Sequence, residues 1–195
     1  MEIKGEYRVA APREKVFAAL NDASILKACI PGCESLEKLS DTEMTAKVRL
    51  RIGPVSAAFS GKVTLSDIDP PKGYRISGEG QGGVAGFAKG GAVVALQEDG
   101  SETILTYDVD AQVGGKIAQV GARLITGTAK KLADEFFGKF ATTINNPSAA
   151  AVAGVPSSQS GPPVPPSDTV QRGYRHWTVI GVGAAVLILI FLASR

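Results

Sequence analysis

The sequence predicts an α+β domain in which a curved antiparallel sheet wraps around one long C-terminal helix. The segments follow the order strand, two short helices, a run of strands and a long helical stretch. The strand segments alternate apolar and polar residues, which is typical of a sheet with one buried face. The helical stretch repeats apolar residues at spacings of three and four. These patterns place the domain at residues 1–145, with a linker at 146–173 and an apolar segment at 174–195.

The first part of the domain predicts a strand and two short helices. Residues 2–11 read as a strand, and Pro12 suits the first turn of the helix that follows it. The second helix is expected to start near Asp22 or Ser24 and to end at the Pro-Gly pair 31–32, which cannot continue a helix.

A meander of strands comes next. Residues 44–52 alternate so that Met44 and every second residue face the core, while Lys47, Arg49 and Arg51 face outward. Further strands are predicted at 55–69, 74–80, 90–97 and 102–113, with Gly- and Pro-containing turns between several of them. The long helix is predicted over 116–144, with an apolar face formed by Ala118, Ala122, Ile125, Ala129, Leu132, Phe136, Phe140 and Ile144.

Seven glycines between Gly78 and Gly91 need a separate explanation, because Gly78, Gly80 and Gly83 spell the dinucleotide-binding pattern G-x-G-x-x-G. That fingerprint requires a helix directly after the glycines, since the helix N-terminus holds the pyrophosphate. Residues 84–96 instead read as a strand, rich in Gly and β-branched residues. Two explanations remain. The glycines allow the sheet to twist and form β-bulges, or they keep one face of the sheet free of side chains and leave space for a ligand.

The composition excludes several kinds of active site. The only histidine is His176, so a Ser-His-Asp or Cys-His site is excluded within the domain. Cys29 and Cys33 are too few for a zinc site, and we expect structural thiols. No catalytic residue and no metal site are predicted. Residues 1–146 contain equal numbers of acidic and basic residues, which argues against a nucleic-acid partner.

The C-terminal part predicts a membrane anchor on a disordered tether. Six of the eleven prolines lie in 146–173, a composition typical of a disordered linker. The uncharged run 177–194 spans about 27 Å as a helix, close to the ~30 Å of a bilayer core. Trp177 suits the interface, and Arg172 and Arg175 outnumber Arg195, which favours a cytoplasmic domain. No signal peptide is predicted, so a single-pass anchor in the cytoplasmic (inner) membrane is expected.

Three strings resemble a known family: residues 20–39 (LNDASILKACIPGCESLEKL), 85–92 (AGFAKGGA) and 121–140 (GARLITGTAKKLADEFFGKF). They resemble the G subunit of carbon monoxide dehydrogenase, within the START-like helix-grip (SRPBCC) superfamily. The resemblance implies a non-catalytic accessory protein that recruits molybdenum carbon monoxide dehydrogenase, or a related molybdenum hydroxylase, to the membrane. It also implies that a respiratory quinone, ubiquinone or menaquinone, binds in a hydrophobic cavity as a non-covalent ligand.

A respiratory quinone has an apolar isoprenoid chain and a small polar head group, so a protein that binds it needs a mostly apolar cavity. The expected cavity wall consists of Leu26, Ile30, Val48, Phe59, Val84, Phe87, Tyr107, Val120, Leu124 and Thr128. The hydroxyls of Tyr107 and Thr128 either meet a quinone carbonyl or bond to backbone. Three other functions stay open: a structural tether with a packed core and no ligand, a general lipid-binding START-like protein, and an enzyme of the cyclase type.

Overall fold

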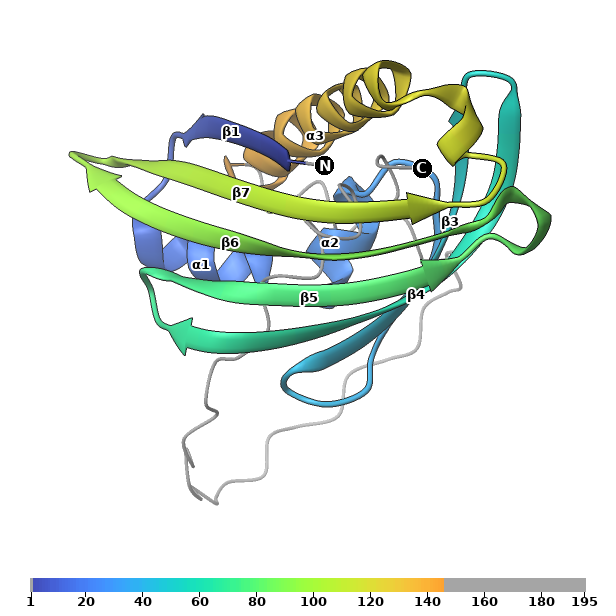
Figure 1. Ribbon diagram of the computed structural model, residues 1–195. Coiled ribbons are helices and arrows are strands. Elements are labelled where there is room, and N and C mark those ends of the chain that lie inside the picture. The colour runs from blue at the N-terminus through green and yellow to red at the C-terminus, as the bar shows by residue number, and fades with distance from the viewer. Residues whose placement is uncertain (1, 146–195) are drawn as a thin grey trace, which may run out of the picture.

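The computed structural model describes residues 2–145, which form a seven-stranded antiparallel sheet with a long helix across its concave face (Figure 1). The strands are β1 Glu2–Val9, β2 Cys33–Lys38, β3 Glu43–Ile52, β4 Val55–Asp69, β5 Gly73–Gln81, β6 Phe87–Asp99 and β7 Glu102–Gly114. The helices are α1 Arg13–Leu20, α2 Ala23–Cys29 and α3 Ala122–Asn145, with short 3₁₀ turns at Gly83–Ala85 (η1) and Ala118–Val120 (η2). The predicted α+β order, with a sheet curved around the last helix, is confirmed.

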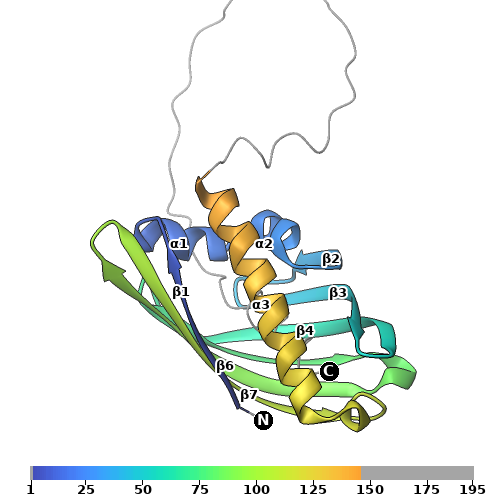
Figure 2. The same ribbon diagram turned by 90° about the horizontal axis from the view of Figure 1, so that it is seen from above.

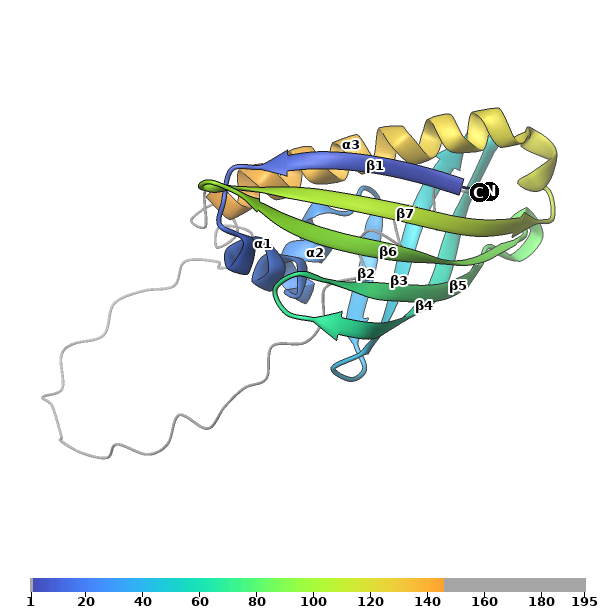
Figure 3. The same ribbon diagram turned by 60° about the vertical axis from the view of Figure 1, so that its left-hand side comes forward.

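The sheet order is β1-β7-β6-β5-β4-β3-β2, so each strand from β2 to β7 pairs with its neighbour in sequence and β1 closes the edge beside β7. Because β1 and β2 lie at opposite edges, the chain between them must cross from one side of the sheet to the other. α1 and α2 make that crossing at one end of the concave face (Figure 2). α3 runs along the length of β1 on the same face (Figure 3).

The expected start of the second helix is confirmed. The Asp22 side chain caps α2 by accepting hydrogen bonds from the backbone N–H groups of Ser24 (2.7 Å) and Ile25 (3.2 Å). These are two of the donors that a helix N-terminus leaves without a partner inside the helix.

The predicted start of the long helix is wrong by six residues. α3 begins at Ala122, because Gly115 (φ +87°) and Gly121 (φ +96°) adopt left-handed backbone conformations that no helix continues through. Ala118 and Ala122 are therefore exposed rather than part of the buried face. Ala133 and Phe137 are buried in addition to the predicted positions, and Leu132 is half-buried.

The alternation predicted for β3 is confirmed: Met44, Ala46, Val48, Leu50 and Ile52 are buried, while Lys47, Arg49 and Arg51 are exposed. β2 was not predicted, because Leu36 is its only buried side chain and gives no alternation. The linker and anchor predicted for 146–195 lie outside the described residues. Among the helices of residues 2–145, none has the length and apolarity needed to cross a membrane.

Candidate functional site on the concave face

Side-chain size divides the concave face of the sheet into two halves. The first, which we call the packed half, lies toward α1 and carries large buried side chains: Tyr74, Ile76, Val94, Leu96, Leu105 and Tyr107 from β5–β7 and Phe136, Phe137, Phe140 and Ile144 from α3. The second, the small-residue half, carries Gly78, Gly80, Ala88, Gly90, Ala92 and Ala111 from the same strands and Gly82 directly after β5. Ala129 and Ala133 are buried on the preceding turns of α3.

The packed half is held together by aromatic contacts between α3 and the β1 edge. The ring of Tyr7 stacks on Phe137 with 4.0 Å between centroids, and Tyr107 stacks beyond it at 6.3 Å from Phe137. The Tyr7 hydroxyl donates a hydrogen bond to Asp134 of α3. Burial raises the pKa of Tyr7 well above its usual range, and the hydrogen bond to Asp134 raises it further. Tyr7 therefore stays a neutral donor that ties β1 to α3.

Several of the glycines on β6 and in the β5–β6 connection serve close packing. A Cβ on Gly82 would collide with the buried ring of Phe59, and a Cβ on Gly90 would collide with the Asp110 carbonyl on the neighbouring strand. Gly86 approaches the Gly114 backbone in the same way. The pattern Gly78–Gly83 leads from β5 through η1 into β6 instead of into a helix, so it lacks the helix N-terminus that a pyrophosphate needs.

The structure brings five of the predicted wall residues into the core. Leu26 and Ile30 are buried at α2, and Val48 and Phe59 are buried on β3 and β4. Tyr107 is also buried, but its hydroxyl lies over Gly5 and hydrogen-bonds with Tyr7. Burial raises the pKa of the Tyr107 hydroxyl, so it remains protonated at neutral pH.

Three further predicted residues lie at the end of the domain opposite α1. Val84 and Leu124 are exposed, and Val120 is half-buried beside Gly53. Phe87 lies on the convex face with its ring over Gly114, because Gly86 sets the register in which Ala88 faces inward. Phe87 therefore does not belong to the concave wall.

The hydroxyl of Thr128 donates to the carbonyl of Leu124, one turn earlier in α3, at 2.9 Å. Of the two partners expected for this hydroxyl, a quinone carbonyl or the backbone, the structure shows the backbone. Ligand contact at the other predicted positions stays a prediction.

Sequence reasoning missed Tyr74, whose side chain enters the packed half from β5. Its hydroxyl is buried and has no hydrogen-bond partner within residues 2–145, while its ring packs edge-on against Phe17 of α1. Burial raises the pKa of Tyr74 well above its usual value, so the group is a neutral hydroxyl. A buried hydroxyl without a hydrogen-bond partner makes folding less favourable. Tyr74 is therefore a candidate partner for a polar atom of a bound ligand.

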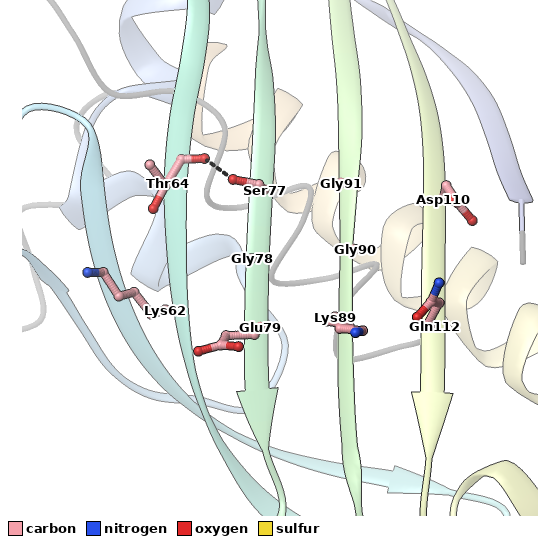
Figure 4. A pocket seen from close by; sticks show the side chains of 10 residues that line it. All are labelled: Lys62, Thr64, Ser77, Gly78, Glu79, Lys89, Gly90, Gly91, Asp110 and Gln112. Atoms are coloured by element: carbon pink, nitrogen blue, oxygen red, sulfur yellow. Dashed lines mark hydrogen bonds between the residues drawn. The ribbon is translucent and has the colours of Figure 1, made fainter.

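The convex face carries a polar hollow of about 600 Å³ over β4–β7, lined in part by the backbone of Gly78, Gly90 and Gly91 (Figure 4). Its rim is formed by Lys62, Thr64, Ser77, Glu79, Lys89, Asp110 and Gln112. The Ser77 hydroxyl is used locally, because it donates to the Thr64 carbonyl at 3.5 Å. Charges of both signs and open access suit a polar surface and not an isoprenoid.

The basic row on β3 is only partly available to a partner. Glu34 of β2 takes an ion pair from Lys47 (3.4 Å) and another from Arg49 (2.9 Å). The hydrogen bond from Arg49 is the main reason that the pKa of Glu34 lies below its usual value. Arg51 forms no ion pair within the described part of the chain.

The thiols are free and shielded. Cys29 is buried and Cys33 half-buried, and burial raises the pKa of both. Within residues 2–145 no three His, Cys, Asp or Glu side chains gather closely enough to hold a metal ion.

The sequence and the fold are both similar to those of known proteins. Residues 5–145 match the model of the CoxG family, the G subunit of carbon monoxide dehydrogenase. A conserved protein from Geobacillus kaustophilus is 34% identical, with a TM-score of 0.71 over 75% of this chain and 96% of its own. The Zhui aromatase/cyclase from Streptomyces sp. R1128 shares 13% identity and a TM-score of 0.53 over 80% of this chain and 99% of its own.

A protein from Mesorhizobium loti shares 13% identity and a TM-score of 0.55 over 75% of this chain and 98% of its own. At such identities the likeness to these last two shows the fold alone. No curated protein matched the sequence. The sequence match over 5–145 and the curved sheet around α3 together assign the chain: it belongs to the CoxG family of carbon monoxide dehydrogenase, on the helix-grip fold of the polyketide cyclase-like proteins.

Proposed function

We propose that this chain is a non-catalytic, membrane-attached accessory protein of molybdenum carbon monoxide dehydrogenase. It holds a respiratory quinone, ubiquinone or menaquinone, between α3 and the sheet and presents it to the enzyme as electron acceptor. The chain is attached to the cytoplasmic membrane through 174–195, with the domain on the cytoplasmic side. The family match over residues 5–145 is the observation that carries this proposal.

The small-residue half supports the choice of ligand. Ala88 on β6 is buried, yet its strand neighbours are Gly80 on one side and Val113 on the other. Ala129 and Ala133 are buried on the facing turns of α3, after Ile125 in the first turn. Small apolar side chains on both walls suit an isoprenoid chain, which needs volume and few polar contacts.

Mass spectrometry of an organic extract tests the quinone directly. The full chain is expressed in a quinone-containing host, purified in detergent and extracted, and the expected result is about one isoprenoid quinone per chain. Ala88→Leu is expected to lower this occupancy with little loss of stability, because the added side chain enters the volume that the quinone uses. Ala95→Leu, on the convex side of the same strand, is the matched control and should retain the quinone.

One observation favours a tether without ligand. Gly82 and Gly90 are already explained by the Phe59 ring and the Asp110 carbonyl, and this explanation requires no guest. A tether predicts an empty extract from a well-folded chain. It also predicts that Ala88→Leu destabilises the domain by about 1–3 kcal/mol, because the side chain would be forced into a closely packed core.

A further inference from the structure

Three connections meet at the end of the domain opposite α1. We call this end the tip and define it as residues 51–55, 82–87 and 114–124. A Cβ on Gly53 would lie 2.8 Å from the Leu124 side chain, so the β3–β4 turn touches the start of α3. The backbone N–H of Ile117 donates to the Ala85 carbonyl at 3.1 Å, which joins the other two connections. Figures 1 and 2 show the three connections gathered at one end.

The tip exposes large apolar side chains. Val84 is 85% exposed, Leu124 46% and Phe87 42%. They are three of the five large hydrophobic residues that the described part of the chain leaves exposed, and they come from two connections that are in contact. Exposed apolar residues that gather at one end mark an interaction surface, whereas scattered ones need no explanation.

The charges of the tip are all positive. Its three segments contain Arg51, Lys116 and Arg123 and no aspartate or glutamate. All three side chains are exposed, and none of them forms an ion pair with another residue of 2–145. These cations are therefore available to negative groups outside the domain.

We propose that the tip lies against the surface of an anionic lipid bilayer. Val84, Phe87 and Leu124 would enter the boundary between headgroups and acyl chains, while the cations meet lipid phosphates. A second copy of the same tip is a poorer partner, because it would bring like charges together. The inference rests on the membrane attachment proposed above and adds which face of the domain meets the bilayer. It also places the small-residue half next to the bilayer, in which a quinone dissolves.

Site-specific fluorescence in vesicles tests the orientation. The full chain, in a Cys33→Ser background, receives an environment-sensitive NBD label through Val84→Cys at the tip or Ser101→Cys at the β6–β7 turn. Each protein is reconstituted into phosphatidylcholine vesicles with and without phosphatidylglycerol. The expected result is a blue shift and quenching by brominated lipid at position 84 in anionic vesicles, with neither at position 101. The parent without an added cysteine corrects for labelling of the buried Cys29.

Charge reversal tests whether the cations of the tip are needed for its contact with lipid. Arg51→Glu, Lys116→Glu and Arg123→Glu together should remove the blue shift at position 84, while Lys130→Glu and Lys131→Glu on exposed α3 positions should leave it. Equal signals at 84 and 101, or equal signals in neutral and anionic vesicles, would overturn the inference. A blue shift that appears in detergent as protein concentration rises would assign the tip to a second copy instead.

Flotation of the same vesicles distinguishes the two proposals. A chain that floats without a signal at position 84 is attached but oriented differently, so the inference alone fails. A chain that neither floats nor gives a signal contradicts the proposed attachment as well.

Discussion

The two ends of this domain follow opposite rules for side-chain size and charge. Toward α1, the concave face is filled by aromatic and aliphatic side chains, and charges at the surface are paired, as Arg8 is with Asp99 and Arg13 with Glu98. Toward the tip, β5 and β6 carry glycine and alanine on the inner face, and the surface exposes apolar side chains and unpaired cations. The first end stabilises the fold, and the second leaves apolar side chains and cations exposed at the surface.

The largest expected difference between the two ends is in how much a substitution on α3 lowers the free energy of unfolding. Phe140 is completely buried in the packed half, so Phe140→Ala should lower the free energy of unfolding by about 3–5 kcal/mol. Leu124→Ala, at the tip end of the same helix, should change it by less than about 1 kcal/mol because its side chain is already half in water. Chemical denaturation of the detergent-solubilised chain measures both. Comparable losses would show that the tip is part of the stable core.

A smaller effect on stability is expected at the tip. Gly82→Ala places a methyl group against the Phe59 ring and should destabilise the domain by about 1–3 kcal/mol. The loss should shrink in a Phe59→Leu background, where the ring is gone, and a double-mutant cycle measures that coupling. Additive losses would mean that Gly82 is needed for its backbone and not for the space above it.

The unpaired hydroxyl in the packed half gives a still smaller effect on stability. Tyr74→Phe removes a buried donor that has no partner within residues 2–145, so stability should stay unchanged or rise by about 1 kcal/mol. If the quinone head reaches Tyr74, the same variant should lower quinone occupancy in the organic extract. Loss of stability without loss of quinone would point to a structural partner for the hydroxyl, such as a buried water.

The sequence predicted the features that depend on local periodicity. The alternation in β3 assigned its inner and outer residues correctly because a strand has a period of two. The apolar spacing in α3 found Ile125, Phe136, Phe140 and Ile144, but it ran on through Gly121, whose left-handed backbone ends the pattern. β2 was not predicted, because only Leu36 faces the core and the strand shows no alternation.

The site depends on contacts that no periodicity reports. Phe87 reads as an apolar residue of an inner strand, yet the preceding turn sets the register that places it on the convex face. Gly82 reads as open space, yet the ring of Phe59, distant in sequence, occupies it. The missing partner of Tyr74 is visible only once the surrounding strands and α1 are in place.

The smallest predicted effect concerns the charges between the two ends. Lys47 and Arg49 are paired with Glu34, whereas Arg51, next in the same outward row, is not. Because the folded protein holds the pKa of Glu34 below its usual value, the carboxylate contributes stability above an unfolded pKa of about 4.3 and loses that contribution as the pH falls through the folded pKa. Glu34→Gln should therefore lower the melting temperature slightly at pH 7, and its difference from the parent should shrink as the pH falls toward 3.

High salt should reduce the difference at pH 7, since the pairs lie at the surface. Glu37→Gln on the same strand is the control, because Glu37 forms no ion pair within residues 2–145 and its replacement should not matter at either pH. If Glu34→Gln also leaves lipid contact at the tip unchanged, the paired cations belong to the sheet and only the unpaired ones serve the bilayer. Increased lipid contact in Glu34→Gln would show instead that Glu34 restrains a basic row that extends from β3 to the tip.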